Sequence, residues 1–341
     1  MRIVFAGSPG IAVPALEALA GFAGDEFQLA GVLSNPDKAR GRHGTPEPTE
    51  VAAAAALLSE RLRRGNRPPL KILKPERLGS AAREAVAALE PDLLVSFAYG
   101  RIFGPRFLSL FPRGGINIHP SLLPKYRGAA PIPAAILNRE RETGITIQRL
   151  APEMDTGDIL LQEPFPLTGR ETTASISDLA ARKSAELLPG VLRGLARGTL
   201  TGRPQDHGAA TYCSLITKED GRIDWSKSAA GIDACIRAFT PWPLCFTRHG
   251  ERDLFILEGK AGEKSPGDYA PEKGGRLCFP PEQAGFAEPG RVLGVDKTRG
   301  ILIQTGDGIL EVTRLQYRTK KALEWQAFLN GVQGFTGSLL R

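Results

Sequence analysis

The stretch Met1-Arg-Ile-Val-Phe-Ala-Gly7-Ser8-Pro9-Gly10, together with the segment at 12–20, decides the fold class of this chain. Residues 2–6 form a short apolar run typical of a buried strand, and the run ends at a turn made of Gly, Ser and Pro. Apolar residues then return at helical spacing between residues 12 and 20. A strand, a turn and a helix in this order are the repeating unit of an α/β protein.

Further apolar segments extend this pattern through the first half of the chain. Strands are expected at 29–34, 92–97, 115–118 and 144–150, and a helix is expected within 76–89. Strands that alternate with helices predict a mostly parallel sheet with both faces covered. Ligands of such sheets bind beyond the carboxyl ends of the strands, where Phe97-Ala-Tyr-Gly100 and Ile118-His119 lie.

The second half of the chain follows a different pattern. Residues 194–209 are polar, contain Gly, Arg and Pro, and show no periodicity, which predicts a linker. Short alternating runs between residues 254 and 312, separated by turns with Gly and Asp, predict a small β-barrel or sandwich. We expect a surface insertion at 263–289 and a short terminal helix at 322–329. The predicted boundaries are a catalytic domain at 1–193, the linker at 194–209 and a β domain at 210–341.

Composition places the chain among ordinary globular proteins. Its 341 residues are 42% hydrophobic and 24% charged, which suffices for two domains with separate cores. No segment approaches the roughly 18 consecutive apolar residues of a transmembrane helix, and the N-terminus lacks the apolar core of a signal peptide. The four cysteines are scattered, without ligand spacing to one another or to His. We therefore expect a cytoplasmic protein with reduced thiols, no membrane attachment and no metal site.

The chain is mildly basic, with a net charge of +7 and a pI of about 9.3. Residues 38–77 contain ten Lys or Arg against four Asp or Glu. A second basic cluster lies near the C-terminus and consists of Arg314, Arg318, Lys320 and Lys321. Such clusters could follow a phosphate backbone, although on charge alone a solvated surface is the simpler interpretation.

Candidate catalytic groups lie in Asn117-Ile-His-Pro-Ser-Leu-Leu-Pro124 and in Met154-Asp-Thr-Gly-Asp158. Asn117 and His119 are two residues apart, so on a strand their side chains leave the same face. An amide N–H can hold a developing oxyanion, an imidazole can move a proton, and the Asp155 carboxylate can fix the tautomer of that imidazole. These groups suit an acyl transfer to an amine. The alternatives are a structural His119 and an Asp155 that only caps a turn.

Taken together, these segments resemble the methionyl-tRNA formyltransferase family over nearly the whole chain. The first-domain motifs are shared with the wider group of 10-formyltetrahydrofolate-dependent formyltransferases, whereas the second-domain motifs indicate the transfer-RNA branch. The resemblance is carried in the first domain by Met1-Arg-Ile-Val-Phe-Ala-Gly7, Asn117–Pro124, Arg127-Gly-Ala-Ala-Pro-Ile132, Glu142-Thr-Gly-Ile-Thr-Ile147 and Asp155-Thr-Gly-Asp158, and in the second by Arg222-Ile-Asp-Trp225, Cys235-Ile-Arg-Ala-Phe239, Pro241-Trp-Pro243 and Thr305-Gly-Asp-Gly-Ile-Leu310.

The resemblance implies a Rossmann-like formyltransferase domain with a mostly parallel sheet, followed by a small OB-like β-barrel that binds tRNA. It implies that the α-amine of methionine on initiator tRNA attacks the formyl group of 10-formyltetrahydrofolate, through a tetrahedral intermediate, for translation initiation. Asn117, His119 and Asp155 occupy the active-site positions of the family. No metal is implied, and nothing in the sequence calls for more than a monomer.

The resemblance also implies where the two substrates bind. An apolar floor with backbone donors and acceptors suits the flat pterin ring of folate. The matching residues are Gly100, Arg101, Ile102, Phe103, Ser121, Leu122, Leu123, Pro124 and Met154. Arg101 replaces the apolar residue more usual at its position, so either its backbone alone serves the ligand or its side chain meets the glutamate tail. Contacts with tRNA are implied for Arg40 and Arg42, in a loop that lacks the lysine run of the family, and for the C-terminal cluster of Arg314, Arg318, Lys320 and Lys321.

Other functions fit part of the pattern. A formyltransferase for a small amine, such as an amino sugar nucleotide or glycinamide ribonucleotide, would share the first set of motifs, but the second set argues against the glycinamide branch. A 10-formyltetrahydrofolate hydrolase would use the same Asn117, His119 and Asp155 with water in place of the amine. An RNA-binding protein without catalysis would have no use for these three side chains.

Overall fold

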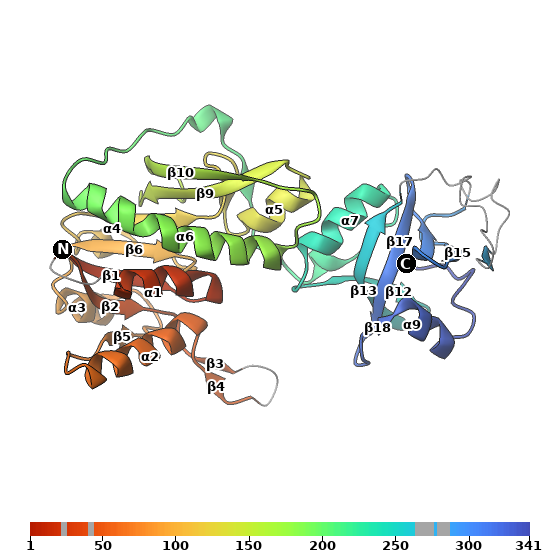
Figure 1. Cartoon of the computed structure of the whole chain (residues 1–341), viewed down its shortest axis with the longest axis horizontal. Coiled ribbons are helices and arrows are strands. Elements are labelled where there is room, and N and C mark those ends of the chain that lie inside the picture. The colour runs from red at the N-terminus through yellow and green to blue at the C-terminus, as the bar shows by residue number, and fades with distance from the viewer. Residues whose placement is uncertain (22–25, 40–43, 263–275, 278–286) are drawn as a thin grey trace. The chain divides into compact units, whose positions relative to one another are not determined.

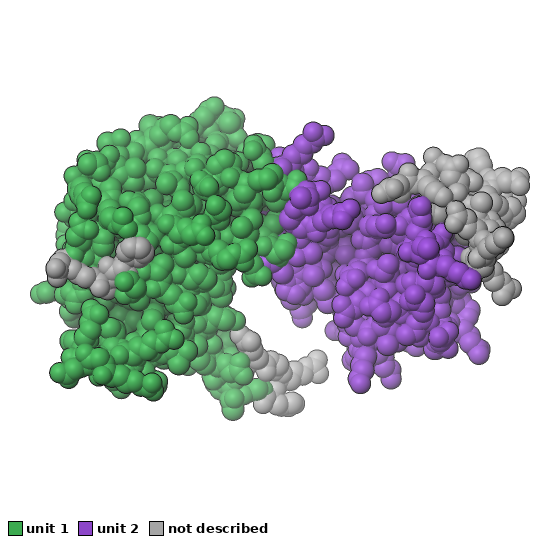
Figure 2. All heavy atoms as spheres, viewed as in Figure 1, with its two compact units in different colours: residues 1–131, 142–167, 175–214 green, residues 132–141, 168–174, 215–341 purple. Residues whose placement is uncertain are grey.

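The structure is a computed structural model that describes residues 1–21, 26–39, 44–262, 276–277 and 287–341 (Figure 1). The chain divides into two compact units (Figure 2). Unit 1 comprises residues 1–131, 142–167 and 175–214, and unit 2 comprises residues 132–141, 168–174 and 215–341. None of the described helices is long and apolar enough to cross a membrane.

A seven-stranded sheet with the order β10-β9-β7-β6-β1-β2-β5 forms the centre of unit 1. Neighbours from β7 to β5 are parallel, whereas β9 runs antiparallel to β7 and β10 runs antiparallel to β9. The prediction of a mostly parallel sheet is therefore confirmed. The strands are β1 (Arg2–Gly7), β2 (Gln28–Leu33), β5 (Lys71–Leu73), β6 (Leu93–Phe97), β7 (Gly115–His119), β9 (Glu142–Arg149) and β10 (Ile159–Pro166).

Helices connect and cover these strands (Figure 1). Helix α2 (Glu50–Arg64) begins after a side-chain cap, because the Thr49 hydroxyl accepts a hydrogen bond of 3.1 Å from the Ala52 N–H. Two more short strand pairs, β3 with β4 and β8 with β11, lie outside the central sheet. The remaining elements up to residue 213 are η1 (Gly10–Ala12), α1 (Val13–Gly21), β3 (Lys38–Ala39), β4 (Pro46–Glu47), α2 (Glu50–Arg64), α3 (Ser80–Ala87), α4 (Pro105–Leu108), β8 (Arg127–Gly128), α5 (Pro131–Leu137), α6 (Thr173–Ala196), η2 (His207–Ala209) and β11 (Tyr212–Cys213).

A ladder of aromatic rings anchors the segment that follows β6. Tyr99 stacks on Phe103 and Phe103 on Phe107, each with ring centroids 5.4 Å apart, and Phe111 lies 5.9 Å beyond. All four rings belong to a buried cluster that includes Leu94 of β6. Such ring pairs contribute about 0.5–1.5 kcal/mol each beyond the area that they bury, so the chain at the carboxyl end of β6 is firmly held.

Unit 2 is built on an antiparallel sheet with the order β12-β13-β17-β16-β15-β14, and β18 pairs with β17. The alternating runs of the sequence form its central strands, so the predicted second, smaller β domain is confirmed. Alternate side chains of β13 and β17, such as Leu254, Ile256 and Leu315, are completely buried. The elements are η3 (Glu219–Gly221), α7 (Ala229–Ala238), β12 (Cys245–His249), β13 (Arg252–Ala261), β14 (Arg276–Leu277), β15 (Val292–Asp296), β16 (Gly300–Gln304), β17 (Ile309–Tyr317), β18 (Leu323–Glu324) and α9 (Trp325–Gly331).

The segment that follows α6 makes specific contacts within unit 1. Arg203 exchanges two backbone hydrogen bonds of 2.8 Å with Ile159 at the start of β10. Gln205 is buried, and β11 pairs in parallel with β8. The domain boundaries expected at 193 and 210 remain predictions, but residues 203–213 are part of the framework of unit 1.

Candidate active site

The neighbouring antiparallel strands β7 and β9 carry most of the polar side chains of the site. Asn117 lies directly opposite Gln148, and His119 lies opposite Thr146. Because directly opposed residues share a face of the sheet, these four side chains line one surface. Gln148 and Thr146 are almost completely buried, at 1% and 0% exposure, whereas Asn117 is partly exposed, so this polar surface reaches solvent at Asn117.

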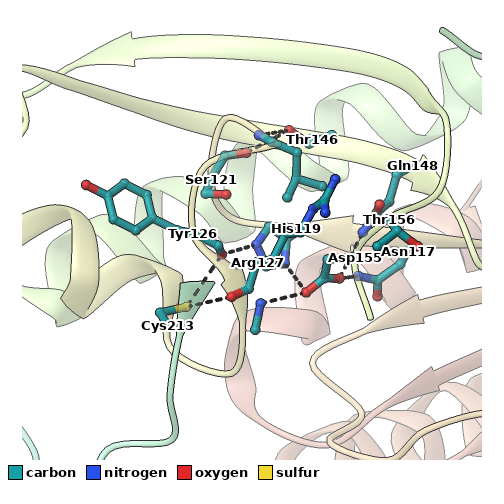
Figure 3. A network of polar contacts seen from close by, with 12 residues as sticks. Asn117, His119, Ser121, Tyr126, Arg127, Thr146, Gln148, Asp155, Thr156 and Cys213 are labelled. Carbon is teal, nitrogen blue, oxygen red and sulfur yellow. Dashed lines mark hydrogen bonds and ion pairs between the residues drawn. The ribbon is translucent and has the colours of Figure 1, made fainter. Parts of the chain in front are cut away.

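Asp155 brings a carboxylate onto this surface (Figure 3). Its Oδ1 accepts hydrogen bonds from Gln148 Nε2 at 2.9 Å and Asn117 Nδ2 at 3.4 Å. Its Oδ2 accepts one from the Gly128 N–H at 2.9 Å and lies 3.6 Å from His119 Nδ1. The side chain is only 9% exposed. A buried carboxylate with donors on both oxygens is held in one orientation.

The turn that carries Asp155 is tightly folded. Asp155 has a left-handed backbone conformation, with φ at 57°. Two residues later, a Cβ on Gly157 would overlap the carbonyl of Arg149. A glycine is therefore required at residue 157, and this explains the Asp-Thr-Gly order of the motif.

Hydrogen bonding fixes which nitrogen of His119 carries a hydrogen. Nε2 lies 2.9 Å from the carbonyl oxygen of Tyr126, which can only accept. Nε2 therefore donates, and in the neutral ring Nδ1 carries no hydrogen. Nδ1 faces the Asp155 carboxylate, which can stabilise a proton that binds there. Asn117, His119 and Asp155, which the sequence predicts to act together, lie within contact distance of one another through the Asp155 carboxylate.

The segment at 121–124, for which contact with folate is predicted, is held by side chains of β9 and β10. The Thr146 hydroxyl donates to the Ser121 carbonyl at 2.7 Å and accepts from the Leu123 N–H at 3.1 Å. Gln162 Nε2 donates to the Leu123 carbonyl at 2.7 Å. Ser121 and Leu123 are buried, whereas Leu122 and Pro124 are partly exposed. The segment is therefore held by hydrogen bonds from within the chain, and its contact with folate stays a prediction.

The other predicted folate residues differ sharply in their surroundings. Ile102 is 71% exposed and Met154 is 55% exposed, which is unusual for large apolar side chains. Gly100 is exposed with φ at 77°, whereas the Phe103 ring is buried in the aromatic ladder, so only its backbone could serve a ligand. Arg101 Nη1 donates to the carbonyls of Pro75 and Glu76, at 3.0 and 2.7 Å, and so ties two loops together.

The residues predicted to bind tRNA divide into three groups. Arg40 and Arg42 lie outside the described residues. Arg314 forms an ion pair of 3.1 Å with Glu258, and Arg318 forms one of 2.8 Å with Asp253. Lys320 and Lys321 are exposed. Exposed ion pairs contribute only about 0–1 kcal/mol, so a phosphate could displace them, and the tRNA contacts stay predictions.

Several groups around Asp155 were not predicted from the sequence. Gln148 could have been found by pairing the predicted strands at 115–118 and 144–150, which sets it beside Asn117. The Gly128 N–H and the Tyr126 carbonyl act through the backbone and leave no sequence signal. Gln205 lies in the segment predicted as a linker. In the described part of the chain, no group of three or more His, Cys, Asp or Glu could hold a metal ion.

Comparison with known proteins places both parts of the chain. Residues 1–192 match the family model described as formyl transferase, and residues 215–333 match the formyl transferase C-terminal domain. The methionyl-tRNA formyltransferase of Treponema denticola is 46% identical over 336 residues, which is 98% of each chain. That of Borrelia recurrentis is 36% identical over 339 residues, or 99% of each chain.

Solved structures of lower identity share the fold. WlaRD, a sugar 3N-formyl transferase, has a TM-score of 0.60 at 19% identity, with 94% of this chain and 99% of that chain covered. HypX from Aquifex aeolicus has a TM-score of 0.60 at 17% identity, with 98% of this chain and 48% of that chain covered. At these identities the two structures show the fold alone. The near-full-length relatives narrow the assignment further: this chain belongs to the methionyl-tRNA formyltransferase family.

Proposed function

We propose that the protein transfers the formyl group of 10-formyltetrahydrofolate to the α-amino group of methionine on initiator tRNA, in the cytoplasm, for the initiation of translation. The observation that carries the chemistry is the buried Asp155 carboxylate, which contacts both the Asn117 amide and the His119 imidazole. Membership of the methionyl-tRNA formyltransferase family supports the choice of acceptor.

The first step is attack of the methionyl nitrogen on the formyl carbon, which turns the formyl oxygen into an oxyanion. The Asn117 amide carries two hydrogens, and one of them points toward Asp155 Oδ1. The other remains for the oxyanion. Removing one such donor costs roughly 10²–10³ in kcat, so Asn117 carries a substantial share of the rate.

The second step moves one proton. Attack leaves a positive charge on the methionyl nitrogen, which must lose a proton, while N10 of the folate must gain one as its bond to carbon breaks. His119 Nδ1 takes the proton, directly or through a water molecule, and returns it to N10. Asp155 Oδ2, 3.6 Å away, stabilises the ring while it carries both protons. The products are the formamide and tetrahydrofolate, and the enzyme ends in its starting protonation state. Proton transfer of this kind contributes roughly 10²–10⁴ in rate.

The donor site is supported by two exposed apolar side chains near the motif residues. Ile102 and Met154 would lose their contact with water under a flat heteroaromatic ring. Backbone groups in the segments at 100–103 and 121–124 would contact the edge of the pterin. HypX, which shares the fold, is described in complex with tetrahydrofolic acid. For the acceptor, the proposed contacts are Arg40, Arg42, Arg314, Arg318, Lys320 and Lys321.

The proposal is tested with methionine-charged initiator tRNA and 10-formyltetrahydrofolate that is radiolabelled in its formyl group. We expect label on the aminoacyl-tRNA, none on uncharged tRNA, and loss of transfer in His119→Ala. Asn117→Asp removes the proposed oxyanion donor, and Asn138→Asp is its matched surface control, because the exposed Asn138 directly follows α5 and donates its amide to the Ala134 carbonyl. Release of tetrahydrofolate without labelled tRNA would overturn the proposal in favour of a hydrolase, and label on a small amine alone would favour a small-amine formyltransferase.

A further inference from the structure

Arg127 is a buried cation close to the candidate active site. It is 2% exposed. Its Nε and Nη2 donate to Gln205 Oε1 at 3.2 and 2.7 Å, Nη2 also lies 3.1 Å from His207 Nδ1, and Nη1 donates to the Tyr212 hydroxyl at 3.3 Å. Among the residues that the structure describes, none of these recorded partners is a carboxylate. A buried charge without a direct counterion needs compensation from elsewhere, and Gln205, which accepts two of these hydrogen bonds, supplies part of it.

The Gln205 side chain can adopt only one amide orientation. It is 6% exposed. Its Oε1 accepts from the guanidinium of Arg127, and its Nε2 faces three oxygens, those of Gln148 Oε1 at 3.1 Å and of the Asp155 and Gly157 carbonyls at 2.9 and 2.7 Å. The flipped amide would set an oxygen among oxygens and hydrogens against a guanidinium. Gln205 therefore donates toward Asp155 and accepts from Arg127.

Gln148 continues the chain of hydrogen bonds in the same direction. Its Oε1 accepts from Gln205, and its Nε2 donates at 2.9 Å to Asp155 Oδ1. The sequence of donors runs from Arg127 to Gln205, to Gln148 and to the Asp155 carboxylate. It begins at a cation and ends at an anion. Each amide is thus polarised in the sense that strengthens the next bond. The first two links are buried, and the link from Gln148 to Asp155 is partly buried.

We propose that Arg127, Gln205 and Gln148 form a relay of positioning residues for Asp155; the proposal rests on the function proposed above. The relay fixes Oδ1 through the Gln148 amide and fixes the left-handed turn through the two carbonyls that Gln205 holds. The neighbour of Arg127, Gly128, fixes Oδ2 through its N–H. The short strand β8 therefore acts on both oxygens of one carboxylate, on Oδ2 directly through Gly128 and on Oδ1 through Gln205 and Gln148.

None of the three relay residues is assigned a contact with substrate, so their loss should act on kcat and leave both KM values close to those of the wild type. Gln205→Met and Gln148→Met keep the side-chain volume and remove the amide. We expect each to lower kcat by about 10- to 100-fold, which is the range seen when the outer partners of metal ligands are removed from other sites. Gln205→Glu keeps an oxygen for Arg127 but loses the donors, so kcat should fall although Arg127 gains an ion pair.

A double-substitution cycle separates the relay from independent structural roles. If Gln148 and Gln205 act in series, the double variant loses no more kcat than about either single variant, whereas independent roles would multiply the losses. Gln28→Met is the matched control, because Gln28 Oε1 also accepts from an arginine, Arg2, at 2.7 Å, but lies on β2 at the opposite end of the strand from the site. Thermal unfolding of each variant reports whether it is folded.

The relay is overturned if folded Gln205→Met keeps wild-type kcat, if only KM changes, or if the losses multiply in the double variant. A wild-type protein that does not formylate methionyl-tRNA would instead remove the function proposed above. In that case a crystal structure of Gln205→Met decides the relay: an Asp155 carboxylate turned away from Asn117 supports it, and an unchanged carboxylate overturns it.

Discussion

The role of the Asp155 carboxylate can be tested by changing this one side chain to an amide. Oδ1 accepts from two amides and Oδ2 from a backbone N–H, so Asp155→Asn must set its new NH2 group against a donor in either orientation. We expect the variant to fold but to lose about 10²- to 10⁴-fold in kcat, since the proton carrier also loses its negative partner. Formyl transfer and circular dichroism melting measure the two effects. Turnover near that of the wild type would remove Asp155 from the mechanism.

A second residue prediction concerns pH and unit 2. Burial lowers the pKa of His249, and the Arg252 guanidinium lowers it further. The neutral Nδ1 accepts from the Tyr317 hydroxyl at 2.5 Å. Because the unfolded chain then binds the proton more readily than the folded one, the contribution of His249 to stability is present above a pH of about 6.5 and is lost as the pH falls below it.

The variant that tests this is His249→Gln, which keeps a hydrogen-bond acceptor and removes the titrating ring. We expect its midpoint of denaturant unfolding to change less between pH 7.5 and pH 5.5 than that of the wild type. An equal change in both proteins would show that other groups set the acid sensitivity.

Sequence patterns identify catalytic residues more easily than the residues that hold them in position. Asn117, His119 and Asp155 could be predicted because their motifs are short and local. Gln205 could not, since its role depends on a turn 50 residues earlier in the chain. Arg127 was part of a family motif, but nothing in that motif indicates that its side chain is buried against an amide.

At the scale of the element, the turn between β9 and β10 sets the position of Asp155. A Cβ on Gly157 would overlap the carbonyl of Arg149, so the turn could close only after moving backbone. We expect Gly157→Ala to lower the free energy of unfolding by about 1–3 kcal/mol, as overpacking does, and to lower activity as well. Gly79→Ala is the control, because a Cβ there meets nothing within 4 Å. Equal stability of the two variants in denaturant titrations would contradict this account of the turn.

Two strands of the central sheet, β5 and β10, could not be predicted from the sequence, each for a physical reason. β5 has only three residues, Lys71–Leu73, and so shows no period. β10 contains Gln162, Glu163 and two prolines, and it is tolerated because it lies at the edge of the sheet, where a missing N–H leaves no neighbour unpaired. β6 was recognisable for the opposite reason, because all five of its residues are buried and all but Ser96 are apolar.

For the whole molecule, the proposed acceptor is a polyanion and the protein carries a net charge of +7. We expect KM for methionyl-tRNA to rise with salt while KM for 10-formyltetrahydrofolate changes little. If about three phosphates are neutralised, affinity should fall roughly 20- to 40-fold between 50 and 200 mM salt. Steady-state kinetics in potassium chloride, with sucrose as an uncharged control, measure this. If KM for methionyl-tRNA does not change with salt concentration, the basic clusters are not the main contact with the tRNA.

The pairing of β11 with β8 also determines where the catalytic half of the chain could be separated from the rest. The match to the formyl transferase family model ends at residue 192, but Gln205 and β11 follow that point. A protein cut at 192 would contain Asn117, His119 and Asp155 yet lack the side chain that holds the Asp155 turn. Any excised or transplanted catalytic module should therefore extend to at least residue 213. A module that ended where the family match ends would lack residues that hold the active site in place.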